Sequence, residues 1–261
     1  MIKRIFIFFL LAISCSGLLA QKFTSYDRYF TWNPDSSIVY SGPGIDTDTV
    51  ASLAYGTEIK LLERLEHIKA SVRIGTIELA PEDSLSEDGY YLPGYWVKVR
   101  TADKKTQGYI FSGEAINFPP LEANEESYSR SLKGYTSYFG VEIIEKETQK
   151  PVALEGESYN VYETMVQFPE GSYKKTDLFD GCSDSEYHFP GRSLAQVYFL
   201  FITNYYAPGQ NVPDFSYGKP EFDFEEGAKL NFIAPENTTY EGLFIDVDES
   251  GKITFGSYTC T

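Results

Sequence analysis

Short runs of alternating apolar and polar residues dominate the first half of the chain. Alternation of this kind, bounded by turn residues, predicts β-strands with one buried face. Gly, Pro, Asp and Ser separate the runs, as expected for turns. The predicted strands cover residues 38–40, 50–53, 58–62, 95–100 and 108–111. We therefore expect a small β-barrel between about residues 21 and 120.

Residues 63–94 lengthen this pattern with an insertion. Ile68, Val72, Ile74 and Ile77 give residues 67–78 a strand-like pattern, and an acidic loop follows at residues 81–89. An extended hairpin that prolongs two barrel strands accounts for both features. We expect the acidic tip of this hairpin to be solvated.

A break in the pattern separates the two halves of the chain. Residues 117–120 read N-F-P-P, and residues 121–130 are polar and acidic, which predicts a linker. The second half, residues 131–261, resembles no family that we recognise. Its predicted strands cover residues 141–144, 159–168, 221–224, 230–233, 242–246 and 252–258. A β-rich α+β domain is expected there.

One segment of the second half has helical spacing instead. Its apolar positions are Leu194, Val197, Tyr198, Phe201, Ile202 and Tyr205. Ser193 stands where a helix cap is expected, and Pro208 where a helix would stop. Aromatic and β-branched residues also suit a strand, but the spacing favours a helix. The predicted fold is mainly β: an SH3-like barrel followed by a β-rich domain with one helix.

The first 20 residues are predicted to be a secretory signal peptide. Lys3 and Arg4 precede an apolar run at residues 5–13, and small residues follow it up to Ala20. The run is shorter than the roughly 20 apolar residues that span a bilayer, and no later stretch is long enough, so no transmembrane span is expected. Cleavage after Ala20 is favoured, and lipidation of Cys15 is the alternative. The predicted location is periplasmic or secreted, or lipid-anchored through Cys15.

Composition and charge restrict the classes of function. The chain is 42% hydrophobic and 16% aromatic, which suits a folded protein rather than a disordered one. Its 38 acidic residues outnumber 22 Lys and Arg residues, giving a formal net charge of −16. Nucleic-acid binding requires a basic surface, so we expect no nucleic-acid partner.

Two cysteines remain beyond the predicted signal peptide. In an oxidising compartment an even pair predicts a disulfide, here between Cys182 and Cys260. Residues 180–183 read D-G-C-S and superficially resemble the D-C-S-G stretch of papain-like cell-wall peptidases. A catalytic thiol needs an imidazole base, and His188 is the only histidine after Cys182. We therefore expect no catalytic role for Cys182. Because His67 is the only other histidine, we expect no zinc site either.

Residues 246–251, D-V-D-E-S-G, begin like a calcium loop. Such a loop ends with a bidentate Glu at its twelfth position, where this chain has Ser257. The flanking residues alternate as strands, so a hairpin turn explains the stretch better. No metal or other cofactor is expected.

The first half resembles the bacterial SH3-type domains known as SH3b. The resemblance rests on I-V-Y at 38–40 running into S-G-P at 41–43, G-T at 56–57, W-V-K-V at 96–99 and G-Y-I at 108–110. The chain departs from the family in the insertion at residues 63–94 and in having Tyr40 where the family usually has Arg. The resemblance covers about a third of the chain.

The SH3b resemblance implies a targeting or interaction module that recognises cell-wall peptide or another protein in a groove between loops. The residues expected to line that groove are Tyr40, Asp46, Asp48, Trp96 and Tyr109. Trp96 equally suits a position in the core. The predicted function is an exported, non-catalytic binding protein of the cell envelope. The alternative is an envelope hydrolase with a carboxylate pair in the second half.

Overall fold

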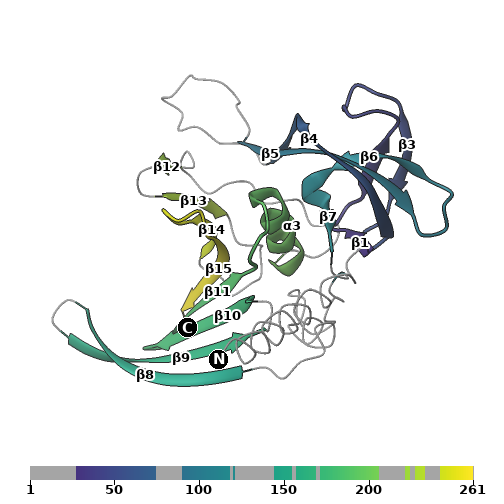
Figure 1. The fold of residues 1–261 in the computed structure, drawn as a ribbon. Coiled ribbons are helices and arrows are strands. Elements are labelled where there is room, and N and C mark those ends of the chain that lie inside the picture. Colours follow the sequence, from purple (N-terminus) through teal and green to yellow (C-terminus); the bar gives the residue numbers. More distant parts are fainter. Residues whose placement is uncertain are drawn as a thin grey trace, which may run out of the picture.

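The computed structural model describes residues 28–74, 90–117, 120, 144–154, 157–168, 171–205, 221–223, 227–232 and 242–260. These residues form two antiparallel sheets with one α-helix between them (Figure 1). Within these residues, the prediction of a mainly β fold with one helix is confirmed. The predicted signal peptide, with Cys15, lies outside the described residues.

The first sheet curls into a half-barrel and has the strand order β3-β2-β6-β5-β4-β1-β7. Its elements are β1 (Arg28–Thr31), β2 (Ser37–Tyr40), β3 (Thr49–Leu53), β4 (Glu58–Ile74), β5 (Tyr90–Thr101), β6 (Gln107–Phe111), the 3₁₀ turn η3 (Ser112–Glu114) and β7 (Ala115–Ile116). All five predicted strands are present. The two short strands β1 and β7 were not predicted, because four and two residues carry too little alternation to be recognised.

The insertion is an extended hairpin, as predicted. Strands β4 and β5 pair from Ile59↔Thr101 out to Ile74↔Tyr90. The register of β4 shifts twice, between Leu61 and Glu63 and between Leu65 and Lys69. The acidic tip at residues 81–89 lies outside the described residues.

The second sheet has the order β12-β13-β14-β15-β11-β10-β9-β8. Its strands are β8 (Ile144–Leu154), β9 (Glu157–Gln167), β10 (Tyr173–Phe179), β11 (Cys182–His188), β12 (Glu221–Asp223), β13 (Gly227–Phe232), β14 (Gly242–Val247) and β15 (Ile253–Cys260). Strands β10, β11 and most of β8 were not predicted. The sequences of β10 and β11 are rich in charged and hydroxyl side chains, and lack the apolar alternation that identifies a strand.

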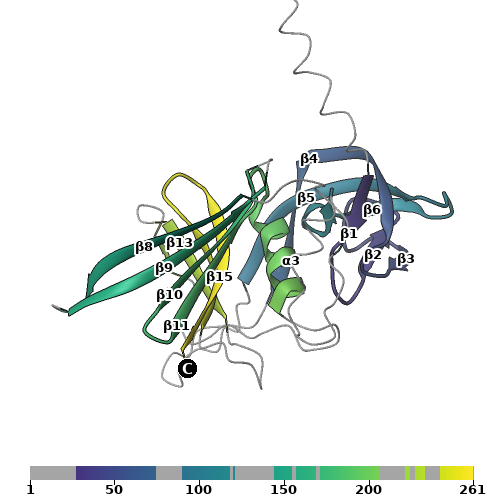
Figure 2. The ribbon, with the colours of Figure 1, turned by 90° about the horizontal axis from the view of Figure 1, so that it is seen from below.

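Helix α3 (Leu194–Tyr205) confirms the helical prediction. It begins with a reciprocal capping box: the Gln196 amide donates to Ser193 Oγ (3.3 Å), and the Ser193 amide donates to Gln196 Oε1 (3.2 Å). Ten of its twelve residues are buried, because it lies between the two sheets (Figures 1 and 2). Burial on nearly all sides explains why nine of its twelve residues are apolar.

The two halves of the chain share one apolar core around α3. That core joins Trp32, Leu92, Phe111 and Ile116 of the first half to the residues Leu230, Phe232, Leu243, Ile245 and Phe255 of the second. A Cβ on Gly113 would lie 2.6 Å from Ala195 Cβ, so the glycine permits close approach of η3 and α3. Gln196 Nε2 also donates to the Ala115 carbonyl (2.9 Å). The division into two domains with a linker at 121–130 stays a prediction.

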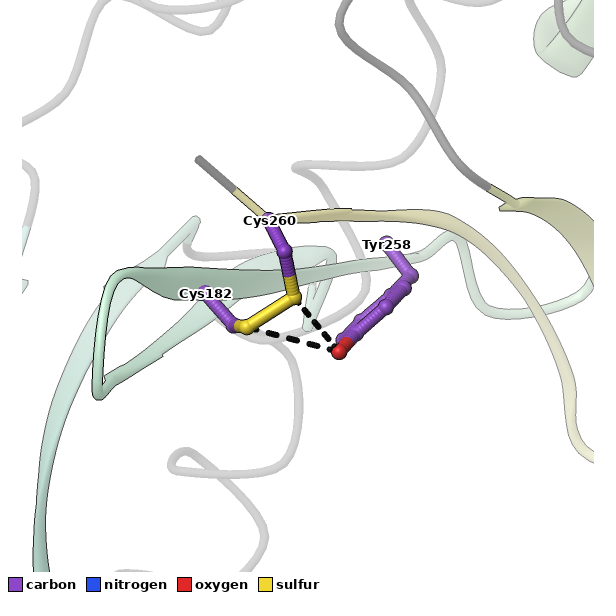
Figure 3. The surroundings of a disulfide bond; sticks show 3 residues. All are labelled: Cys182, Tyr258 and Cys260. Carbon is purple, nitrogen blue, oxygen red and sulfur yellow. Dashed lines mark hydrogen bonds between the residues drawn. A yellow bond between two sulfur atoms is a disulfide. The ribbon is translucent and has the colours of Figure 1, made fainter.

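Cys182 and Cys260 form the predicted disulfide bond. They are directly paired residues of the neighbouring strands β11 and β15. The Tyr258 hydroxyl lies against both sulfur atoms, 3.4 Å from Cys182 Sγ and 2.7 Å from Cys260 Sγ (Figure 3). The disulfide therefore joins adjacent strands near the end of the chain.

The stretch that begins like a calcium loop is the turn of the β14–β15 hairpin. Asp248 Oδ1 accepts hydrogen bonds from the Ser250 amide (2.9 Å), the Ser250 hydroxyl (2.6 Å) and the Lys252 amide (2.9 Å). Gly251 has a φ of 78°, which the turn requires. The predicted hairpin is thus confirmed. The described ranges contain no helix long and apolar enough to cross a membrane.

Candidate functional site

A cavity of about 360 Å³ opens where the first sheet meets the beginning of α3. We call it the junction pocket. Its lining residues are Tyr29, Arg64, Tyr95, Ser112, Asn117, Pro190, Gly191, Arg192, Ser193 and Gln196. They come from β1, β4, β5, the segment around η3 and the segment that leads into α3. Both halves of the chain therefore contribute to the pocket.

Arg64 and Tyr29 form one polar edge of the junction pocket. Arg64 lies between the two register shifts of β4, and irregularities of this kind redirect strand side chains. Its Nη2 donates to the Tyr29 hydroxyl (2.8 Å). Because a phenol both accepts and donates, the Tyr29 hydroxyl keeps its own proton for a ligand.

The part of the pocket formed by β5 and η3 is fixed by a close backbone contact. The Tyr95 amide donates to Ser112 Oγ (3.1 Å). A Cβ on Gly94 would lie 2.9 Å from that oxygen and 2.5 Å from the Phe111 ring. Gly94 therefore allows η3 to lie against β5. Burial raises the pKa of Tyr95, so its hydroxyl stays protonated at neutral pH.

The opposite wall is the segment that leads into α3. Its polar groups are largely committed to the capping box between Ser193 and Gln196, and the Gln196 side chain also binds the Ala115 carbonyl. Gly191 has a φ of 72°, which turns the chain into the helix. Arg192 also lines this wall.

The charge of the junction pocket is opposite to that of the whole chain. Two guanidinium groups, of Arg64 and Arg192, line it, and none of its described lining residues is acidic. Arginine stays protonated under all ordinary conditions. A cationic hollow in a chain of net charge −16 is suited to an anionic group.

Glu114 is buried at the end of η3 and does not line this pocket. Only 7% of it is exposed, and Asn33 Nδ2 donates to its Oε1 (3.1 Å). Burial raises the pKa of Glu114 to about 7, although the side chains of Ser37 and Asn33 act in the opposite direction. Its backbone carbonyl accepts a hydrogen bond from the Trp32 amide (2.9 Å).

The predicted aromatic site on the first sheet is only partly assembled. The rings of Tyr40 and Trp96 meet edge to face at 5.5 Å, and Tyr40 pairs with Tyr109 across β2 and β6. Lys98 Nζ lies 5.5 Å from the centre of the Tyr109 ring. Trp96 is only 6% exposed, so it packs as a core residue. A ligand at these aromatic residues stays a prediction.

Asp46 and Asp48 lie in the loop between β2 and β3 and are exposed. The Asp48 carbonyl accepts a hydrogen bond from the Ser41 amide (2.9 Å), which closes this loop. The predicted groove would combine these two carboxylates with the aromatic residues described above. One of those aromatic residues, Trp96, is buried.

The second half contains residues for two chemistries, a catalytic thiol and a carboxylate pair. Cys182 is held in the disulfide, and His188 Nδ1 lies 2.8 Å from the Ile253 carbonyl. Glu163 and Asp177 are paired across β9 and β10. Lys175 Nζ lies 3.5 Å from Glu163 Oε2 and 2.5 Å from Asp177 Oδ2. A catalytic carboxylate pair in the second half stays a prediction.

Sequence reasoning missed the residues of the junction pocket. Tyr29 stands in an unpredicted strand, and Arg64 looks like an ordinary polar strand position. Of these three residues, only Arg192 adjoins a feature predicted from the sequence, because it directly precedes the expected helix cap Ser193. The described residues contain no group of three or more His, Cys, Asp or Glu residues placed to hold a metal ion.

Comparison of the chain with protein-family models, with curated proteins and with solved structures gave no match.

Proposed function

We propose that this protein is an exported, non-catalytic binding protein of the bacterial cell envelope that recognises cell-wall peptide. Its ligand occupies the junction pocket. The observation that carries the proposal is the pocket itself: cationic and hydroxyl groups from both halves of the chain converge on one cavity whose walls are held by hydrogen bonds.

The lining of the pocket supports binding rather than turnover. A guanidinium group cannot serve as a general base, and a tyrosine with a raised pKa, such as Tyr95, is a poor one. A serine nucleophile such as Ser112 needs an adjacent base, and the described lining contains neither histidine nor carboxylate. Donors without a base hold a ligand but do not activate it.

Export and the envelope setting rest on the sequence. The basic, apolar and small-residue segments at residues 1–20 have the order of a signal peptide. The Cys182–Cys260 disulfide suits an oxidising compartment. The SH3b resemblance of the first half favours cell-wall peptide as the ligand.

Binding of soluble cell-wall peptide fragments tests this proposal. The disulfide-bonded protein is titrated with them by calorimetry, and the ligand is afterwards analysed by mass spectrometry. We expect saturable binding with no change in ligand mass. Cleaved products would instead support the alternative of an envelope hydrolase, and no heat of binding would contradict recognition of cell-wall peptide.

A further inference from the structure

We propose that the junction pocket binds an oxyanion, a carboxylate or a phosphate, between the guanidinium groups of Arg64 and Arg192. The Tyr29 hydroxyl donates a further hydrogen bond to the same group. This inference rests on the proposed function only for the source of the anion, for which the free carboxylate of a peptide comes first. The pocket chemistry alone carries the rest.

The distribution of charge is the first argument. Acidic residues outnumber basic ones by 38 to 22 in the chain, yet the described lining of the pocket has two arginines and no acid. A cationic ligand would find like charge there, which costs affinity. A chain of net negative charge repels an anion at long range, so a cavity lined by guanidinium groups is the favourable place for one.

The state of Arg64 is the second argument. Arg28, on the neighbouring strand β1, is neutralised by Glu58 through two hydrogen bonds of 2.9 and 2.5 Å. Arg64, by contrast, donates to the neutral phenol of Tyr29 and forms no salt bridge within the part of the chain that the structure describes. The Glu66 carboxylate acts on Arg64 only through a coulombic interaction, so the remaining N–H donors of Arg64 are available to a ligand.

The rigidity of the walls is the third argument. The amides of Ser193 and Gln196 are already engaged in the capping box, so the start of the helix is ordered before a ligand arrives. Gln196 ties this wall to Ala115, and Ser112 ties η3 to β5. A pocket assembled in advance loses little entropy when it binds.

The size of the cavity defines the ligand further. About 360 Å³ lies at the lower end of the range for small-molecule sites. It suits an anionic end group with one or two residues of chain, rather than an extended polymer. The rings of Tyr29 and Tyr95 can cover the aliphatic part of such a group.

Calorimetric titration at low salt tests the inference with three probes. They are acetyl-alanyl-alanine with a free carboxylate, the same dipeptide as its terminal amide, and inorganic phosphate. We expect the free acid to bind and the amide to bind at least about tenfold more weakly, because a charge-assisted hydrogen bond is lost. Binding of phosphate without the dipeptide acid would identify phosphate as the source of the anion.

Matched variants locate the binding. Arg64→Met and Arg192→Met are each expected to weaken binding of the anion about tenfold, and Tyr29→Phe about threefold. Arg28→Met removes the same charge outside the pocket and is expected to leave binding unchanged. Arg64→Lys serves if Arg64→Met does not fold, and should bind less tightly because an ammonium group lacks the planar fork of arginine.

Equal affinity for the acid and the amide would overturn the inference. So would binding that both arginine variants leave unchanged, or failure of both anions to bind. If cell-wall fragments bind but Arg64→Met does not lower their affinity, the inference fails and the proposed function stands. If the small anions bind through Arg64 while cell-wall fragments do not bind, the proposed function fails and the inference stands.

Discussion

The inner and outer parts of the second sheet are held together by different forces. Strands β13, β14 and β15 pack apolar side chains against α3, and Phe201 meets Phe232 at 4.4 Å between ring centres. Strands β9 and β10 instead carry two ion pairs of Lys175, one with Glu163 on the neighbouring strand and one with Asp177 on the same strand. They leave Tyr162 and Leu178 about half exposed. Apolar burial contributes more free energy per side chain than partly buried ion pairs do, because the desolvation of the charges offsets much of their attraction. Stability should therefore be concentrated around α3.

The largest effect is expected at the centre of that core. Phe201 is fully buried and contacts rings from β13 and β15. Phe201→Ala should lower the free energy of unfolding by about 3–5 kcal/mol, because it leaves a cavity. Urea denaturation followed by circular dichroism measures the loss. Leu178→Ala, at a position 45% exposed, is the control and should cost much less. Equal losses would contradict the contrast between the two parts of the sheet.

The disulfide is expected to have the next largest effect. It closes a loop with a sequence separation of 78, so its removal in Cys182→Ser/Cys260→Ser should lower the free energy of unfolding by about 4 kcal/mol. Urea denaturation of the variant and the oxidised protein measures the difference.

Thiol titration of the unfolded, unreduced protein should find neither of these two cysteines free. If ligand turnover were detected and then lost in a folded Cys182→Ser variant, the structural role would be contradicted.

Glu114 should make stability depend on pH. Its pKa in the folded protein is about 7, above the ordinary value of 4.5, so folding favours the protonated form. Its contribution is therefore fully present below about pH 4.5 and is lost as the pH rises through 7, by about 3 kcal/mol in all. In Glu114→Gln this part of the pH dependence should disappear, as measured by urea denaturation at several pH values. An unchanged pH profile would show that Glu114 does not titrate in this range.

The smallest effect is expected at the beginning of α3. Ser193→Ala removes the hydroxyl that accepts the Gln196 amide and should cost about 1 kcal/mol. Ser193→Asp should retain the cap and is the matched control. Thermal unfolding measures both. If the alanine variant also binds the anionic probes less tightly, the capping box orders the junction pocket as well as the helix.

The strands of the first sheet were predictable where apolar alternation is strong, as in β2 to β6. The helix was predictable from its spacing and from Ser193. Strands β10 and β11 were not, since hydroxyl and charged side chains stand on both faces, and their pairing depends on neighbours such as Lys175 with Glu163. The disulfide could be predicted because the two cysteines beyond the predicted signal peptide allow only one pairing.

The sequence by itself determined the local elements and their chemistry: alternating strands, one apolar helix with its cap, a cysteine pair and an acidic surface. These depend on residues that are close together in the chain or on their composition. Only the tertiary structure decided that Trp96 is buried, that α3 lies between two sheets, and that Tyr29, Arg64 and Arg192 line one cavity. Contacts between segments so distant in sequence arise from sheet curvature, the register shifts of β4 and the shared core, none of which a local pattern encodes.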